Sequence, residues 1–259
     1  MKNNRTQSSV NDSNSFLINY FPKFLYLGVF AILCVPFVVF FEVFYPYTVP
    51  KALWVQALNW ILLTVYLCGI IINKELYLRY KPKLNFIFYL YLIYIFAYLV
   101  SSIFGDNFTF SFFGEFQRMN GIYWHIHTLI FLFILSGCSN IDKFFYNLFS
   151  FVFFTGFVLS IFYILEHYKI FYFDMPGYSD NTRAVFTIGN PGFAGFYMML
   201  IFFIGFGLFK INFVNIPFSF LRLNKIKYTY QYYIYYFYVF ITMFLLLYAI
   251  FLTATRSVI

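Results

Sequence analysis

The chain has 259 residues, of which 63% are hydrophobic and only 10% are charged, and its formal net charge is +8. Soluble domains carry roughly 25% charged residues, so this composition excludes a soluble globular protein. The cations fall in short segments between apolar runs rather than in one basic block, which argues against nucleic acid as a partner.

Apolar runs long enough to cross a bilayer recur along the chain. A hydrocarbon core of about 30 Å needs about 20 apolar residues in a helix. The pattern predicts an all-α, polytopic transmembrane bundle with about seven spanning helices, at residues 24–44, 52–72, 84–104, 121–138, 144–165, 190–209 and 232–253.

The first 23 residues are polar and rich in Asn and Ser, which predicts a disordered tail, followed by a transmembrane domain over 24–259. The first span has no small-residue cleavage site and is longer than a signal peptide's apolar core. We therefore expect it to remain as a membrane anchor.

The distribution of Lys and Arg predicts the orientation of these spans. Seven alternating spans leave 12 of the 17 cations on the side of the N-terminus, and the other five are Lys51, Arg118, Lys169, Arg183 and Arg256. Because cytoplasmic loops carry the excess of cations, the N-terminus and the basic tail are predicted to be cytoplasmic. The expected location is the cytoplasmic (inner) membrane, crossed several times.

Two long loops, 105–120 and 166–189, fall on the extracytoplasmic side in this topology, and long loops on one side often carry function. Directly after the second loop, Asn190 is a favoured N-cap and Pro191 suits the first position of a helix. This helix would present its N–H groups and the positive end of its dipole to the outside, where an anion can bind. Arg183 is close enough in sequence to add a bidentate donor to a phosphate. A capped helix that only packs against its neighbours is the alternative.

Two further arginines lie at predicted extracytoplasmic helix ends. Arg118 directly precedes the fourth span, where it is either a ligand contact or an interfacial arginine whose charge reaches the headgroups. Arg256 ends the seventh span, and an ionisable residue at that depth needs a partner or a ligand.

No motif of a soluble enzyme, phosphate loop or metal-ligand cluster occurs, so we expect no metal and no cofactor. His125 and His127 are two residues apart and would lie on different faces of a helix, as polar residues satisfied within the bundle. Glu166 and His167 open the second long loop and could act as acid or base, but nothing in their sequence neighbourhood supplies an orienting group. The catalytic residues therefore stay unassigned.

Three short segments are informative together: Phe113-Gly-Glu-Phe-Gln-Arg-Met-Asn-Gly121, then Arg183 with Thr187-Ile-Gly-Asn-Pro191, and finally Leu252-Thr-Ala-Thr-Arg-Ser257. In this order they resemble the O-antigen ligase and O-antigen polymerase family of polytopic membrane glycosyltransferases. Each motif is weak alone, and their order, spacing and shared side give the combination its specificity. Gly192, Thr255 and Ser257 depart from the family pattern, and the first hundred residues match only as apolar helices.

The resemblance implies transfer of a glycan from a polyprenyl diphosphate to an acceptor saccharide or protein at the outer face of the membrane. It implies diphosphate contacts from Arg183 and Arg256, with Arg118 as a third. Asn190, at the capped helix start, completes the predicted diphosphate site. Family members continue with more helices and a large external loop that carries the acceptor-activating histidine. The chain is accordingly expected to be the N-terminal part of a longer protein.

A membrane transporter or flippase for a lipid-linked or anionic substrate is the alternative function. A transporter should bury polar residues near the bilayer midplane and show repeat symmetry. The predicted spans contain few such residues and no repeat.

Overall fold

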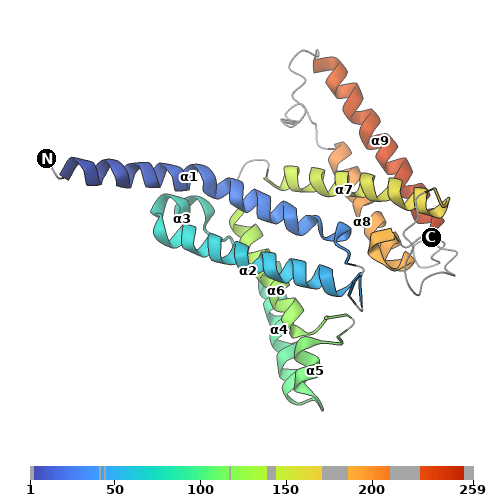
Figure 1. The fold of residues 1–259 in the computed structure, drawn as a ribbon, viewed down its shortest axis with the longest axis horizontal. Coiled ribbons are helices and arrows are strands. Elements are labelled where there is room, and N and C mark those ends of the chain that lie inside the picture. The colour runs from blue at the N-terminus through green and yellow to red at the C-terminus, as the bar shows by residue number, and fades with distance from the viewer. Residues whose placement is uncertain are drawn as a thin grey trace. The chain divides into compact units, whose positions relative to one another are not determined.

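The computed structural model describes residues 3–40, 42–43, 45–116, 118–138, 144–170, 186–210 and 228–253, and every regular element within these ranges is helical. The chain divides into two compact units, Met1–Phe145 and Tyr146–Ile259 (Figure 1). The first unit holds helices α1 (Asn3–Leu33), η1 (Val35–Phe37), α2 (Val49–Ile72), α3 (Lys74–Tyr80), α4 (Phe86–Ile103), α5 (Phe108–Phe113) and α6 (Ile122–Cys138). The second holds η2 (Phe186–Ile188), α8 (Pro191–Lys210), α9 (Tyr228–Leu252) and nearly all of α7 (Phe144–His167).

Among the described residues, five helices are long and apolar enough to cross a membrane: Val49–Ile72, Phe86–Ile103, Phe144–His167, Pro191–Phe209 and Tyr233–Leu252. These correspond to five of the seven predicted spans. The predicted span 121–138 corresponds to a shorter apolar helix, Ile122–Cys138, and the predicted span 24–44 overlaps another, Ile18–Leu33, only over residues 24–33. The chain is thus an all-helical protein with several candidate membrane spans.

The first predicted span differs most from the structure. The helix ends at Leu33, and Pro36, which cannot continue an α-helix, stands at the start of the short helix η1. At its other end, α1 already includes residues 18–23, which the sequence assigned to a disordered tail. Phe21 within that range is 4% exposed, because its ring packs against Tyr80 and against the backbone at Gly69.

Close contact between α1 and α2 organises the first unit. Phe21, Leu25, Val29 and Ile32 are spaced three or four residues apart and are all buried, so they form one face of α1. Glycines stand where the helices approach, since a Cβ at position 28 would collide with Leu62 and one at position 69 with Phe21. Small residues at contact points are a common way for membrane helices to pack.

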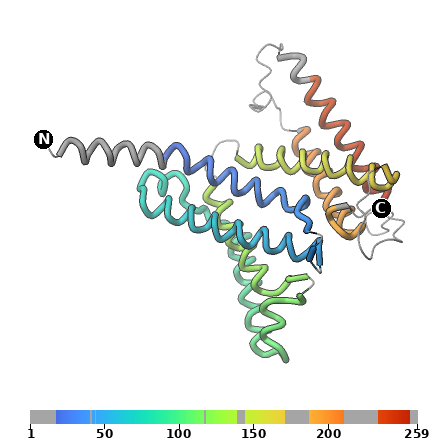
Figure 2. Tube along the Cα trace, viewed as in Figure 1, coloured from blue at the N-terminus to red at the C-terminus, as the bar shows by residue number. Residues whose placement is uncertain are grey.

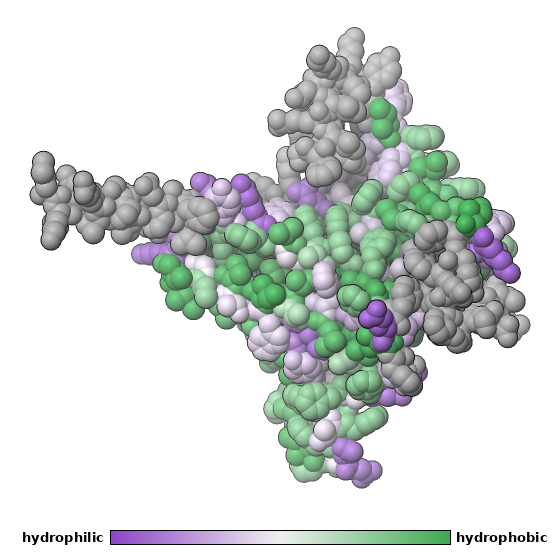
Figure 3. Space-filling view, viewed as in Figure 1, coloured by the Kyte–Doolittle hydropathy of each residue, from purple (hydrophilic) through white to green (hydrophobic). Residues whose placement is uncertain are grey.

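Helix α6 packs against both α2 and α4, and the short helix α5 lies across the end of the α4–α6 pair (Figure 2). Asparagine side chains cap the helices that follow the turns: Asn73 caps α3, Asn85 caps α4 and Asn107 caps α5. Hydrophobic side chains cover much of the surface displayed in Figure 3, as expected of helices that face lipid.

In the second unit, α8 runs antiparallel to α7 and α9 runs parallel to α7. Gly156 of α7 faces Ile201 of α8, and the earlier Phe153 faces the later Gly205. Phe153 and Phe157 contact Tyr238 of α9, whereas Tyr168, just after α7, hydrogen-bonds Tyr248 near the end of α9. The C-terminal ends of α7 and α9 and the N-terminal end of α8 therefore lie at the same end of this unit.

Candidate functional site

Asn190 caps helix α8, as the sequence predicts. Its side-chain Oδ1 accepts hydrogen bonds from the backbone N–H groups of Gly192 at 2.8 Å and Phe193 at 3.4 Å. Pro191 has no N–H, and the N–H of Ala194 donates to the carbonyl of Asn190. Gly189, at φ +80°, takes the left-handed conformation that turns the chain into this cap.

This cap changes how the helix end could hold an anion. The first N–H groups of α8 are already bonded within the protein, so they are not open donors. The amide Nδ2 of Asn190 remains as a donor on an exposed residue, together with the positive end of the helix dipole. An anion at this place would therefore contact the side chain of Asn190 rather than the bare helix terminus.

The same end of the second unit carries the other polar residues that the sequence singled out there. Glu166 is 8% exposed in the last turn of α7, and His167 follows it. Thr253, directly after α9, is fully buried, and its hydroxyl donates to the carbonyl of Ile250. Arg183 and Arg256 lie outside the described residues, each three positions in sequence from a described residue at this end, Phe186 and Thr253.

Arg118 belongs to a tight turn in the first unit. Its side chain is 70% exposed and lies 3.7 Å from Glu115, an exposed ion pair that contributes little to stability. The flanking glycines close the turn: a Cβ on Gly114, which has φ +80°, would come within 2.7 Å of the backbone nitrogen of Asn120. A Cβ on Gly121 would likewise collide with the backbone nitrogen of Gly114, which explains why the turn has glycine at both ends. Arg118 belongs to the first unit, whereas Asn190 belongs to the second.

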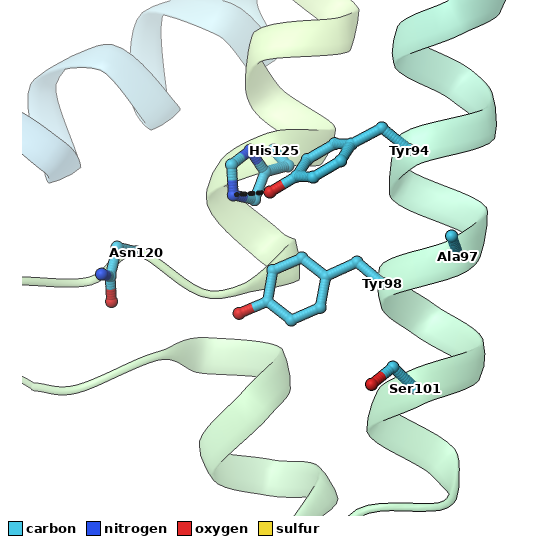
Figure 4. A pocket seen from close by; sticks show the side chains of 6 residues that line it. All are labelled: Tyr94, Ala97, Tyr98, Ser101, Asn120 and His125. Atoms are coloured by element: carbon cyan, nitrogen blue, oxygen red, sulfur yellow. Dashed lines mark hydrogen bonds between the residues drawn. The ribbon is translucent and has the colours of Figure 1, made fainter.

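A pocket in the first unit contains residues that were not singled out as a site from the sequence. It has a volume of about 480 Å³ and is lined by Tyr94, Ala97, Tyr98, Ser101, Asn120 and His125 (Figure 4). The sequence predicts His125 only as a satisfied polar residue, and its imidazole is bonded: Nδ1 lies 2.9 Å from the hydroxyl of Tyr91. In the sequence, the tyrosines of α4 are spaced by three and four residues, which indicates that they share one face of the helix and could have pointed to an aromatic pocket.

His127 points to different neighbours from His125, as its spacing predicts. It is a residue of α6 that is fully buried against α2, and its Nδ1 donates to the carbonyl of Tyr123 at 2.8 Å. Asn59 of α2, also fully buried, donates from Nδ2 to the carbonyl of His127 at 3.2 Å. Within the described part of the chain, the Nε2 of His127 and the Oδ1 of Asn59 have no hydrogen-bond partner.

Metal-ligating side chains do not gather into a site in the described ranges, where no three His, Cys, Asp or Glu residues come together. Comparisons of the whole chain with protein-family models, curated proteins and solved structures find no match. The geometry of the two units and the chemistry of their residues therefore carry the functional argument.

Proposed function

We propose that the chain is a multi-pass protein of the cytoplasmic (inner) membrane, with a cytoplasmic N-terminus, that binds a polyprenyl-diphosphate-linked glycan at its extracytoplasmic face. Following the resemblance to O-antigen ligases and polymerases, it acts in transferring that glycan to a saccharide or protein acceptor. The observation that carries the proposal is the common position of three helix ends in the second unit. The capped start of α8 and the C-terminal ends of α7 and α9 lie together, and in the sequence Arg183 precedes the cap Asn190 by seven positions while Arg256 follows the end of α9, Leu252, by four.

The proposed chemistry follows from charge. A diphosphate leaving group is stabilised by arginines and by an amide donor at the positive end of a helix dipole. In the transfer, the acceptor oxygen bonds to the anomeric carbon, the bond from that carbon to the diphosphate breaks, and a base takes the acceptor proton. Glu166 and His167 lie at the same helix ends, yet no contact assigns either of them the role of the base, which stays open.

The test separates the capping role of Asn190 from its proposed contact with the anion. Asp caps a helix about as well as Asn, so Asn190→Asp should keep the free energy of unfolding. It replaces the donor Nδ2 with a carboxylate oxygen, which repels a diphosphate. Binding of a short-chain polyprenyl diphosphate to the full chain in nanodiscs should weaken by about 1.5–3 kcal/mol, the scale of a hydrogen bond to a charged group. Arg183→Ala and Arg256→Ala should each weaken binding by a similar amount.

Matched controls are available in the first unit. Asn85→Asp makes the same change at the cap of α4, and Arg79→Ala removes a cation from α3 at the proposed cytoplasmic side. Both should leave diphosphate binding unchanged. Equal losses in the controls, or full binding in Asn190→Asp and both arginine variants, would overturn the proposed site.

A transporter or flippase for a lipid-linked or anionic substrate is a second candidate, favoured by one observation. Gln56, Asn59 and His127 are buried within the helices α2 and α6, and buried polar groups inside membrane helices often line substrate paths. Proteoliposomes loaded with a fluorescent lipid-linked glycan distinguish the two functions. Flipping by the purified chain, with loss in Asn59→Leu, would favour transport over transfer.

A further inference from the structure

The pocket between α4 and α6 has a fixed aromatic wall. Tyr94, Ala97, Tyr98 and Ser101 are spaced by three and four residues, so α4 presents them on one face. The rings hold one another in place: the centroid of Tyr98 lies 5.7 Å from that of His125, and Tyr94 lies 6.1 Å from Tyr98. The hydrogen bond between the hydroxyl of Tyr91 and the imidazole of His125 ties this wall to α6.

Neutral polar groups lie opposite and beside the rings. Figure 4 shows the side chains of Tyr98 and Ser101 pointing from α4 toward the segment that carries Asn120. The hydroxyls of Tyr98 and Ser101 and the carboxamide of Asn120 can each donate and accept hydrogen bonds. Ala97 leaves space between Tyr94 and Tyr98. The pocket is open to the surface, and its volume of about 480 Å³ is comparable with that of small-molecule sites, roughly 300–1,000 Å³.

The absence of Arg, Lys, Asp and Glu from the lining restricts the charge of a ligand that the pocket can bind. None of the six lining residues is an arginine, lysine or carboxylate, so the pocket offers no counter-ion for a phosphate or for a cation. An alkyl chain can neither donate nor accept a hydrogen bond, so it would make no use of the hydroxyls and the carboxamide, of which those of Ser101 and Asn120 are exposed. A pyranose ring combines an apolar C–H face, which packs on an aromatic ring, with a rim of hydroxyls that both donate and accept.

We propose that this pocket, between α4 and the segment that leads into α6, is a saccharide-binding site for a neutral pyranose ring. The ring packs on Tyr98, and its hydroxyls bond to Ser101, Asn120 and the Tyr98 hydroxyl. Because the pocket has no charged group, this site does not depend on the diphosphate contacts proposed for the second unit. The saccharide comes either from a soluble acceptor or from a lipid-linked donor.

Saturation-transfer NMR on the full chain in nanodiscs tests the site with methyl glycosides of glucose, galactose and N-acetylglucosamine. Saturation transfer from the protein to at least one of the glycosides is expected. Tyr98→Ala should reduce its affinity about tenfold, the upper range for one aromatic contact. Ala97→Leu, which removes no contact and fills the space between the tyrosines, should abolish binding. Tyr89→Ala is the matched control, because Tyr89 is an exposed tyrosine of α4 that does not line the pocket.

The outcomes are distinct. The proposed site is overturned if no saturation transfer reaches any of the three glycosides. It is also overturned if neither Tyr98→Ala nor Ala97→Leu changes the saturation transfer. Saturation transfer to choline in place of the glycosides would indicate an aromatic cage for a cation and overturns it as well.

The source of the saccharide is identified by comparing methyl N-acetylglucosamine with N-acetylglucosamine on a short polyprenyl diphosphate. Equal Tyr98-dependent affinity supports a soluble saccharide, and tighter Tyr98-dependent binding of the lipid-linked form supports the donor. Because the glycosides carry no phosphate, their binding can succeed or fail whatever happens in the diphosphate experiment.

Discussion

Gly137 of α6 lies against a hydrogen bond that joins two tyrosines of neighbouring elements. The hydroxyl of Tyr66, in α2, donates to the carbonyl of Tyr80, at the end of α3, at 2.6 Å. Both tyrosines are fully buried. A Cβ at position 137 would come within 2.6 Å of the same carbonyl oxygen and would collide with the Tyr66 hydroxyl. The close approach of α6 to this bond therefore requires glycine.

Gly137→Ala should destabilise the protein by about 1–3 kcal/mol, the usual cost of overpacking, although alanine by itself favours a helix. The control is Gly207→Ala in α8, where no atom lies within 4 Å of the added carbon. Unfolding in mixed micelles, followed by circular dichroism, measures both variants. Equal stability of Gly137→Ala and Gly207→Ala would show that the contact among Gly137, Tyr66 and Tyr80 is not formed.

At the scale of the helices, the contact between α2 and α6 contains a polar pair that is only partly satisfied. Asn59 makes one hydrogen bond through Nδ2, to the carbonyl of His127. Its Oδ1 is buried with no partner among the described residues, and such a group costs free energy in a protein interior. A buried polar group that its surroundings do not satisfy is a candidate for function.

Asn59→Leu should leave the free energy of unfolding within about 1 kcal/mol of the parent, because it removes one hydrogen bond and one unsatisfied oxygen together. Asn59→Ala should cost more, about 2 kcal/mol, because it also opens a cavity. Unfolding titrations of the two variants test this. A large loss in Asn59→Leu would mean that the Oδ1 has a partner in the native protein.

For the whole molecule, the helices differ in how much of their surface the protein covers. Only 6% of the apolar window of α4 is buried, whereas 28% is buried in α2 and 39% in α7. Its exposed residues are almost all aromatic or aliphatic. A helix of this kind can remain exposed only in an apolar solvent, which agrees with a membrane span.

The proposed topology predicts opposite accessibility for the two connections of α4. In a variant without the native cysteines, Asp106→Cys should react with a membrane-impermeant maleimide on intact cells, because its loop is proposed to be extracytoplasmic. Arg79→Cys should react only after the membrane is opened. The reverse pattern would show that the protein has the opposite orientation, with the cation-rich loops outside, contrary to the positive-inside rule.

The sequence alone determined the features that depend on local signals. The apolar runs located five long helices, since bilayer thickness fixes the length of such a run, and Asn190 with Pro191 located the start of α8, since capping needs only neighbouring residues. Contacts between helices decided the rest. Phe21 is ordered because it packs on Gly69 and Tyr80, and a tail that looks polar in sequence gave no sign of that contact. The pocket needed α4 and α6 to pair before Tyr98 and His125, 27 positions apart in the chain, could form one wall. Such contacts depend on which helices pack together, and a periodic apolar sequence does not specify its partner.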